Sequence, residues 1–79
     1  MVNVDVISFD TVGRNNLRDY YHIEFDCKDC AKDYLFTYVE DYGYPQVVDG
    51  VAFWRGEDFA LSATIRVDEN VISAFEFIH

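Results

Sequence analysis

The chain has 79 residues, of which 15 are acidic and 6 are basic, so its formal net charge at pH 7 is −9. A chain of this length forms one domain, residues 1–79, and leaves little room for a second core or a deep substrate cleft. Apolar residues make up 51% of the chain and aromatic residues 18%, which excludes a disordered protein. The acidity argues against direct binding to nucleic-acid phosphates or anionic membranes, and it predicts a basic partner.

The beginning of the chain does not have the pattern of an export signal. Residues 1–5 contain no basic residue and begin no long apolar run. No segment approaches the roughly 20 consecutive apolar residues of a membrane span. We therefore expect the protein in the cytoplasm, where both of its cysteines would be reduced.

Two strands are predicted before the helix. Residues 2–9 begin with three valines at alternate positions, which is the period of a β-strand. Residues 11–18 contain a glycine and two adjacent asparagines, which are turn-forming residues, so we expect a loop. Residues 20–26 alternate again and predict a second strand that pairs with the first as a hairpin.

The clearest predicted element is a helix over residues 28–42. Its apolar residues recur at spacings of three and four and cover a face about 140° wide. Asp26 is expected to be the N-cap, because an aspartate side chain can accept hydrogen bonds from the first free amides. Gly43 is expected to end the helix, and Pro45 prevents its continuation.

The pattern returns to a period of two after the helix. Residues 46–54 are strand-like, but Asp49 and Gly50 interrupt them, either as a tight hairpin turn or as a bulge. Residues 59–67 alternate strictly and predict a further strand, and residues 71–78 predict the last one.

The resulting order is β-β-α-β-β-β. It predicts an α+β fold with an antiparallel sheet of four to five strands and one α-helix packed on one face. A single helix leaves the other face partly open, and Ile7 and Phe9 lie at the opposite parity to the valines of their strand. Apolar surface is therefore expected there for a partner or a second copy, unless loops and edge twist cover it. We expect a monomer or a weak homodimer.

Cys27 and Cys30 form a Cys-Lys-Asp-Cys motif between a predicted strand and the predicted helix. This is the local context of thioredoxin-like thiols. That fold, however, needs further helices and a proline loop facing the thiols, and the neighbouring carboxylates of Asp26 and Asp29 disfavour a thiolate. We therefore expect two semi-buried structural thiols in preference to a redox site.

Zinc is the alternative for the same cysteines, with His22 and His79 as further ligands. Structural zinc sites use two closely spaced ligand pairs, whereas these histidines are far apart in the sequence. Strand parity also places His22 on the opposite face of its strand from Cys27. The sequence contains no Gly-rich phosphate loop, nucleophile elbow or His-x-x-x-His pair. We expect no metal, no cofactor and no catalytic residues, so the chain is not predicted to be an enzyme.

The predicted partner-binding site consists of six residues on or beside the helix: Asp26, Asp29, Asp33, Phe36, Glu40 and Asp41. Asp29, Asp33 and Glu40 project within about 40° of one another and span about 16 Å, a spacing of the same order as that of phosphates along a DNA strand. Phe36 borders this stripe, and an exposed aromatic ring beside carboxylates suits an Arg- or Lys-bearing partner. The alternatives are an acidic face that is only solvated and a Phe36 that a loop covers.

In its size, its acidity and its lack of a catalytic motif, the chain resembles small inhibitor proteins of phages and mobile elements, such as anti-CRISPR proteins and other DNA mimics. The resemblance concerns the character of the whole chain, so it transfers no functional residue. It implies a stoichiometric inhibitor that occupies a basic nucleic-acid-binding surface, such as the site where a CRISPR effector complex reads its target DNA. Two alternatives remain: an immunity- or antitoxin-type protein that neutralises a basic nuclease, and an interaction module whose acidity only provides solubility.

Overall fold

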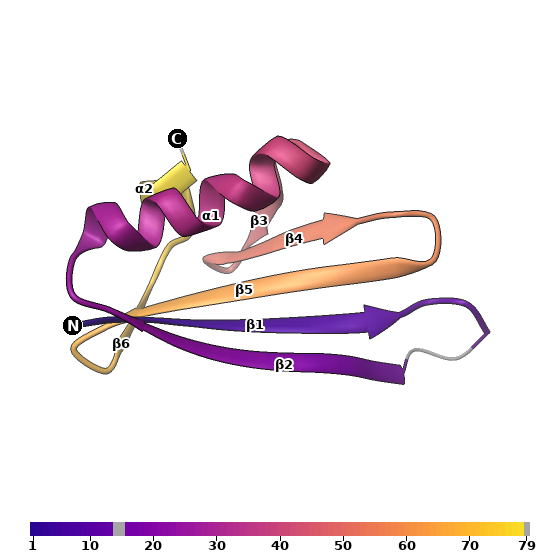
Figure 1. The fold of residues 1–79 in the computed structure, drawn as a ribbon, viewed down its shortest axis with the longest axis horizontal. Helices are drawn as coiled ribbons and strands as arrows, with labels where there is room; N and C mark the ends of the chain where they lie inside the picture. Colours follow the sequence, from indigo (N-terminus) through magenta and orange to yellow (C-terminus); the bar gives the residue numbers. More distant parts are fainter. Residues whose placement is uncertain (14–15, 79) are drawn as a thin grey trace.

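Six strands and two helices make up the described part of the chain (Figure 1). The structure is a computed structural model, and it describes residues 1–13 and 16–78. The elements in chain order are β1 (Val2–Asp10), β2 (Asn16–Phe25), α1 (Lys28–Tyr42), β3 (Gln46–Val48), β4 (Val51–Arg55), β5 (Phe59–Val67), β6 (Asn70–Ile72) and α2 (Phe75–Ile78). The predicted α+β class with an antiparallel sheet is confirmed.

The sheet has the strand order β2-β1-β5-β4-β3, and all neighbouring strands are antiparallel. β1 pairs with β5 along its whole length, from Val2 opposite Val67 to Asp10 opposite Phe59. The other side of β5 is shared, because β4 pairs with its residues 60–63 and β6 with its residues 65–67. β2 therefore forms one edge of the sheet and β3 the opposite edge.

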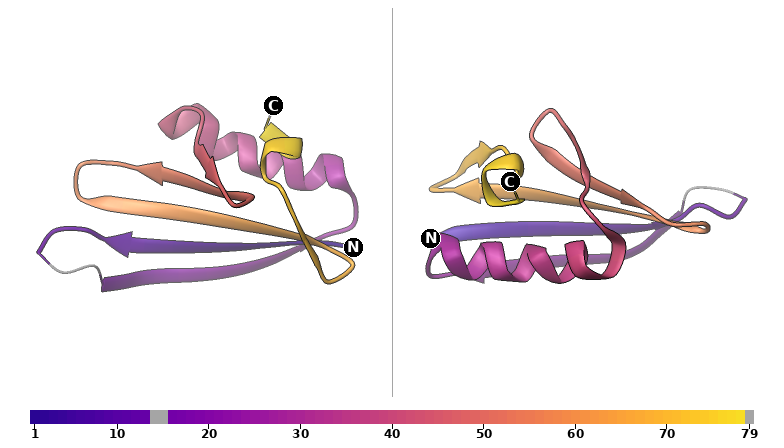
Figure 2. Two further views of the ribbon diagram at one scale, coloured as in Figure 1. Left: turned by 180° about the vertical axis from the view of Figure 1, so that it is seen from behind. Right: turned by 90° about the horizontal axis from the view of Figure 1, so that it is seen from above.

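The two faces of the sheet differ in what covers them. Val4, Val6 and Ile65 are fully buried in the core that α1 closes with Leu35. Both helices lie on this side of the sheet, α1 lengthwise and α2 beside it (Figures 1 and 2). Side chains that alternate with the core residues, such as Asp5, project from the opposite face, which no described helix covers.

Helix α1 has the predicted bounds, Lys28–Tyr42. Ala31 and Leu35 are buried in the core, and Tyr34 and Tyr38 pack against it, as their spacing predicts. Gly43 ends the helix with φ 89° and ψ −174°, a backbone conformation that is essentially restricted to glycine. The predicted C-cap is therefore confirmed.

The predicted N-cap is wrong by one residue. Cys27, with φ −142° and ψ 161°, is the N-cap, and its Sγ accepts a hydrogen bond from the Cys30 amide at 3.2 Å. An N-cap side chain reaches the amides two and three positions later. Because the helix begins at Lys28, those amides are within reach of residue 27 and beyond the reach of Asp26.

The predicted strand over residues 71–78 is also wrong beyond Ile72. The Ala74 amide donates to the Gly50 carbonyl at 2.8 Å, and the Ser73 hydroxyl accepts from the Phe75 amide at 3.2 Å. These bonds turn the chain into α2, where the adjacent Phe77 and Ile78 are both buried. A strand would place two consecutive side chains on opposite faces, whereas one turn of helix can bury both against α1.

Of the two alternatives predicted at Asp49 and Gly50, the tight hairpin turn is confirmed: both residues have positive φ, 52° and 81°. Residues 46–54 therefore contain two strands, and the sheet has six strands where four to five were predicted. One boundary also differs from the prediction. β2 begins at Asn16, within the segment expected to be a loop. Residues 14 and 15 of that expected loop lie outside the described residues.

Candidate functional site

The five acids predicted on or beside α1, which are Asp26, Asp29, Asp33, Glu40 and Asp41, are all exposed. We call them the acidic face of α1, although Asp26 precedes the helix and Asp41 lies about 100° around the helix from Glu40. None of its five carboxylates forms an ion pair within 4.0 Å with another described residue. Asp29 and Asp33 are one helical turn apart, and like charges at this spacing destabilise a helix slightly. Lys28 and Lys32 line a hollow with Asp29, so these lysines lie beside the acidic face without forming an ion pair within 4.0 Å.

Phe36, the sixth predicted site residue, is half-buried. The Nζ atom of Lys32 lies 5.9 Å from the centroid of its ring, which is within the range of a cation–π contact. A cation of this chain therefore already lies over one face of the ring. An Arg- or Lys-bearing partner would have to displace Lys32 or use the other face of the ring.

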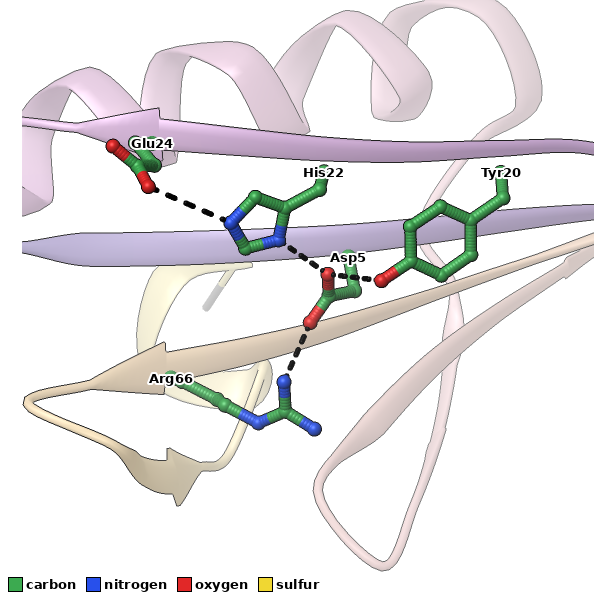
Figure 3. Close-up of polar contacts among 5 residues, drawn as sticks. All are labelled: Asp5, Tyr20, His22, Glu24 and Arg66. Atoms are coloured by element: carbon green, nitrogen blue, oxygen red, sulfur yellow. Dashed lines mark hydrogen bonds and ion pairs between the residues drawn. The ribbon is translucent and has the colours of Figure 1, made fainter.

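A polar cluster that the sequence analysis missed lies on the uncovered face of the sheet (Figure 3). The buried carboxylate of Asp5 accepts hydrogen bonds from the Tyr20 hydroxyl at 2.8 Å and from His22 Nδ1 at 2.7 Å. Its other oxygen accepts from Arg66 Nη1 at 2.9 Å. His22 Nε2 lies 3.7 Å from a carboxylate oxygen of Glu24. The cluster joins the central strands β1 and β5 to the edge strand β2.

The electrostatics of the cluster favour charged Asp5 and charged His22. Burial by itself raises the pKa of Asp5, but the hydrogen bonds from His22 and Tyr20 and the positive charges of His22 and Arg66 outweigh burial and hold it below its ordinary value. The hydrogen bond with Asp5 raises the pKa of His22, and the charges of Asp5 and Glu24 act in the same direction. Because a carboxylate only accepts hydrogen bonds, Nδ1 of His22 carries a proton.

A histidine that is hydrogen-bonded to an aspartate in this way is also found in enzymes, where the histidine transfers protons. Catalysis needs a cavity as well, and the described residues form hollows, three of which lie on the uncovered face or between the helices. None of the three is lined by a member of the cluster. Two of them, of about 160 and 310 Å³, share Arg55 and Ala60 on the uncovered face, and the third lies between α1 and α2. What the hydrogen bonds show is that the Asp5 carboxylate on β1 links side chains of β2 and β5.

The uncovered face also carries apolar side chains, as expected. Phe53 and Leu17 are exposed, whereas Ile7 and Phe9 are half-buried. Phe9 and Phe53 line the two hollows beside Arg55, one each. The face is therefore mixed in character, with aromatic side chains around an arginine at one end and the Asp5 cluster nearer the other.

Cys27 and Cys30 are both free and exposed, so the expectation of semi-buried thiols is wrong. They are exposed because residue 27 precedes the first turn of α1 and residue 30 lies away from the buried stripe of Ala31 and Leu35. The described residues form no group of three or more His, Cys, Asp or Glu side chains able to hold a metal ion. His79, which the zinc alternative required, lies outside the described residues.

A comparison with protein-family models, curated proteins and solved structures finds no match to this chain. None of the described helices is long and apolar enough to cross a lipid bilayer.

Proposed function

We propose that this chain is a non-catalytic inhibitor that binds a basic, nucleic-acid-binding surface of a partner protein through the acidic face of α1. Bound there, it blocks access of DNA, in the manner of a DNA mimic. The observation that carries the proposal is that all five carboxylates of this face are exposed and unpaired within the described residues. A CRISPR effector complex is one partner of the proposed kind.

Energetic reasoning supports a binding role for these carboxylates. Exposed, unpaired charges contribute little to folding, and the repeated negative charges along α1 oppose it slightly. The same charges gain favourable interactions when a row of Lys or Arg side chains approaches. A net charge of −9 also accelerates the encounter with a basic groove over distances of about a Debye length.

The length of the face suits a groove that follows a nucleic-acid backbone. Asp29 and Glu40 are eleven positions apart on the helix, which corresponds to about 16 Å. The carboxylates recur at intervals of one or two helical turns, so several basic side chains of a phosphate-binding groove can be engaged at once. The proposed mechanism is competition for that groove.

The test is a competition experiment with purified CRISPR effector complexes and other DNA-binding proteins, using fluorescent duplex DNA as the ligand that the chain should displace. The variant is Asp29→Lys, Asp33→Lys and Glu40→Lys combined. The matched control is Asp19→Lys, Glu57→Lys and Asp58→Lys, which changes three exposed acids outside α1 and has the same net charge. Circular dichroism and urea unfolding should show that both variants remain folded.

The α1 variant should lose DNA displacement by orders of magnitude, mainly through a lower association rate, and the wild type should weaken as salt rises. The control should lose only the smaller contribution of long-range attraction. If the folded α1 variant displaces DNA as well as the wild type, the acidic face is only solvated and the proposal is wrong. Equal losses in both variants would show that net charge acts without a defined face.

A further inference from the structure

The two cysteines lie close together at the beginning of α1, where the sulfur of Cys27 contacts the backbone of Cys30. Cys27 has extended backbone angles, and its sulfur bends back over the first turn to lie 3.2 Å from the amide nitrogen of Cys30. The Cys27 thiol beside it raises the pKa of the Cys30 thiol. Both side chains are exposed, so a small reagent can reach either sulfur.

This placement is compatible with a disulfide bond. Residues three apart at a helix have Cβ atoms about 5–6 Å apart, and a disulfide needs about 3.5–4.5 Å. The remaining difference is small. Cys27 can supply it through its side-chain torsion and its extended φ and ψ, while its carbonyl keeps the hydrogen bond from the Ala31 amide at 3.3 Å. The buried residues of the first two turns, Ala31 and Leu35, need not move.

We infer that Cys27 and Cys30 form a reversible dithiol whose substrates are low-molecular-weight disulfides of the glutathione class. This modification site is distinct from the acidic face and does not depend on the proposed inhibitory function. Neither sulfur has a packing role that oxidation would remove, since both lie outside the core. The local contact that changes is the N-cap hydrogen bond from the Cys30 amide to Cys27 Sγ.

The reaction proceeds by two exchanges. The Cys27 thiolate, whose sulfur already accepts the Cys30 N–H, attacks one sulfur of glutathione disulfide, forms a mixed disulfide and releases one glutathione thiolate, which takes up a proton. The Cys30 thiol then loses its proton to solvent, attacks the Cys27 sulfur and releases the second glutathione. Two thiols of the chain are oxidised to one disulfide, and one glutathione disulfide is reduced to two glutathione molecules.

The test uses the reduced, folded full-length chain in buffers of oxidised and reduced glutathione, with intact mass and alkylation as readouts. The wild type should lose two hydrogen atoms, whereas Cys27→Ser and Cys30→Ser should each gain one glutathionyl group. A matched control combines Cys30→Ser with Lys32→Cys, which keeps two exposed cysteines at a spacing that cannot close. That control should retain glutathionyl groups.

An NMR experiment provides a second readout that an unspecific oxidation would not change. On closure the amide resonance of Cys30 should shift more than those of the core residues, because it loses its N-cap acceptor. The proposal is overturned if the folded wild type retains glutathionyl groups like the control, or closes only in denaturant. Failure of DNA displacement by the wild type would contradict the proposed function and leave this result unaffected.

Discussion

Replacement of Asp5 by alanine should lower the free energy of unfolding by about 2–3 kcal/mol. Breaking a fully buried ion pair costs about 3–5 kcal/mol because a charge is left without water, whereas one hydrogen bond to a charged group contributes about 1.5–3 kcal/mol. The Asp5 side chain is only 8% exposed, but those of His22 and Arg66 are 44% and 46% exposed. These partners regain water when the carboxylate is removed, so the loss falls below the range for a fully buried pair.

The assay is urea unfolding followed by far-UV circular dichroism near pH 6, where the carboxylate of Asp5 is ionised and His22 is largely protonated. The midpoint should fall while the slope stays constant, because the surface exposed on unfolding is unchanged. Asp5→Asn separates the effect of charge from that of volume. It fills the same space, but its NH2 group replaces one acceptor oxygen and cannot accept a hydrogen bond, so it should recover less than half of the stability that Asp5→Ala loses.

Arg66→Gln provides the comparison within the same cluster, since it removes a single donor and leaves Asp5 with two hydrogen bonds. Its effect should be clearly smaller than that of Asp5→Ala. A loss below about 0.5 kcal/mol for Asp5→Ala would show that the Asp5 carboxylate does not stabilise the sheet, because a charged hydrogen bond in a buried position should contribute more. A loss for Arg66→Gln as large as that for Asp5→Ala would show that Asp5 is not the centre of the cluster.

Three further predictions concern pH, backbone conformation and the thiols. Because the pKa of His22 is raised in the folded state, its pairing with Asp5 stabilises the fold fully below the unfolded pKa of about 6.5 and is lost as pH rises through the folded pKa. The difference in unfolding free energy between the wild type and His22→Gln should therefore shrink as pH rises above about 6.5 in urea titrations, and a constant difference would contradict the assignment. Gly43→Ala should lower the free energy of unfolding by about 1–3 kcal/mol in the same assay, because φ 89° and ψ −174° strain any residue with a Cβ, and an unchanged value would contradict this. Under reducing conditions, Cys27→Ser combined with Cys30→Ser should leave partner affinity unchanged in a titration, and a loss beyond the change in stability would show that the thiols take part in binding.

Elements dominated by local patterns could be predicted from the sequence. Helix α1 and strand β5 have their predicted bounds, 28–42 and 59–67, because periodicity and terminal residues such as Gly43 determine them within the segment itself. Residues 71–78 alternate well enough to predict a strand. The contact of Ala74 with the Gly50 carbonyl, which is distant in sequence, turns this segment into β6 and α2.

The Asp5 cluster could not be predicted without the strand register. Asp5 is opposite His22 in the β1–β2 pair, and Arg66 comes from β5, sixty-one positions away in the chain. A register that matches Val4 with Ile23 would have placed Asp5 beside His22, but the sequence allows several such matches. Exposure of Asp29, Asp33 and Glu40 followed from helical periodicity alone, whereas the contact of Lys32 with Phe36 depends on side-chain conformations that periodicity does not determine.

The fold separates the surface proposed for binding from the cluster that stabilises the sheet. The acidic face belongs to α1 on one side of the sheet, and Asp5 with its partners belongs to the opposite side. Substitutions at distant sites that share no partners have additive effects. Stability and binding can therefore be altered independently in this protein. Arg66→Gln should lower the free energy of unfolding without changing the affinity of the folded protein for a basic partner. The lysine variant of α1 should lower that affinity and leave the protein folded. If the two effects were coupled, the partner would have to contact both faces of the sheet, and the acidic face of α1 would not be the binding site by itself.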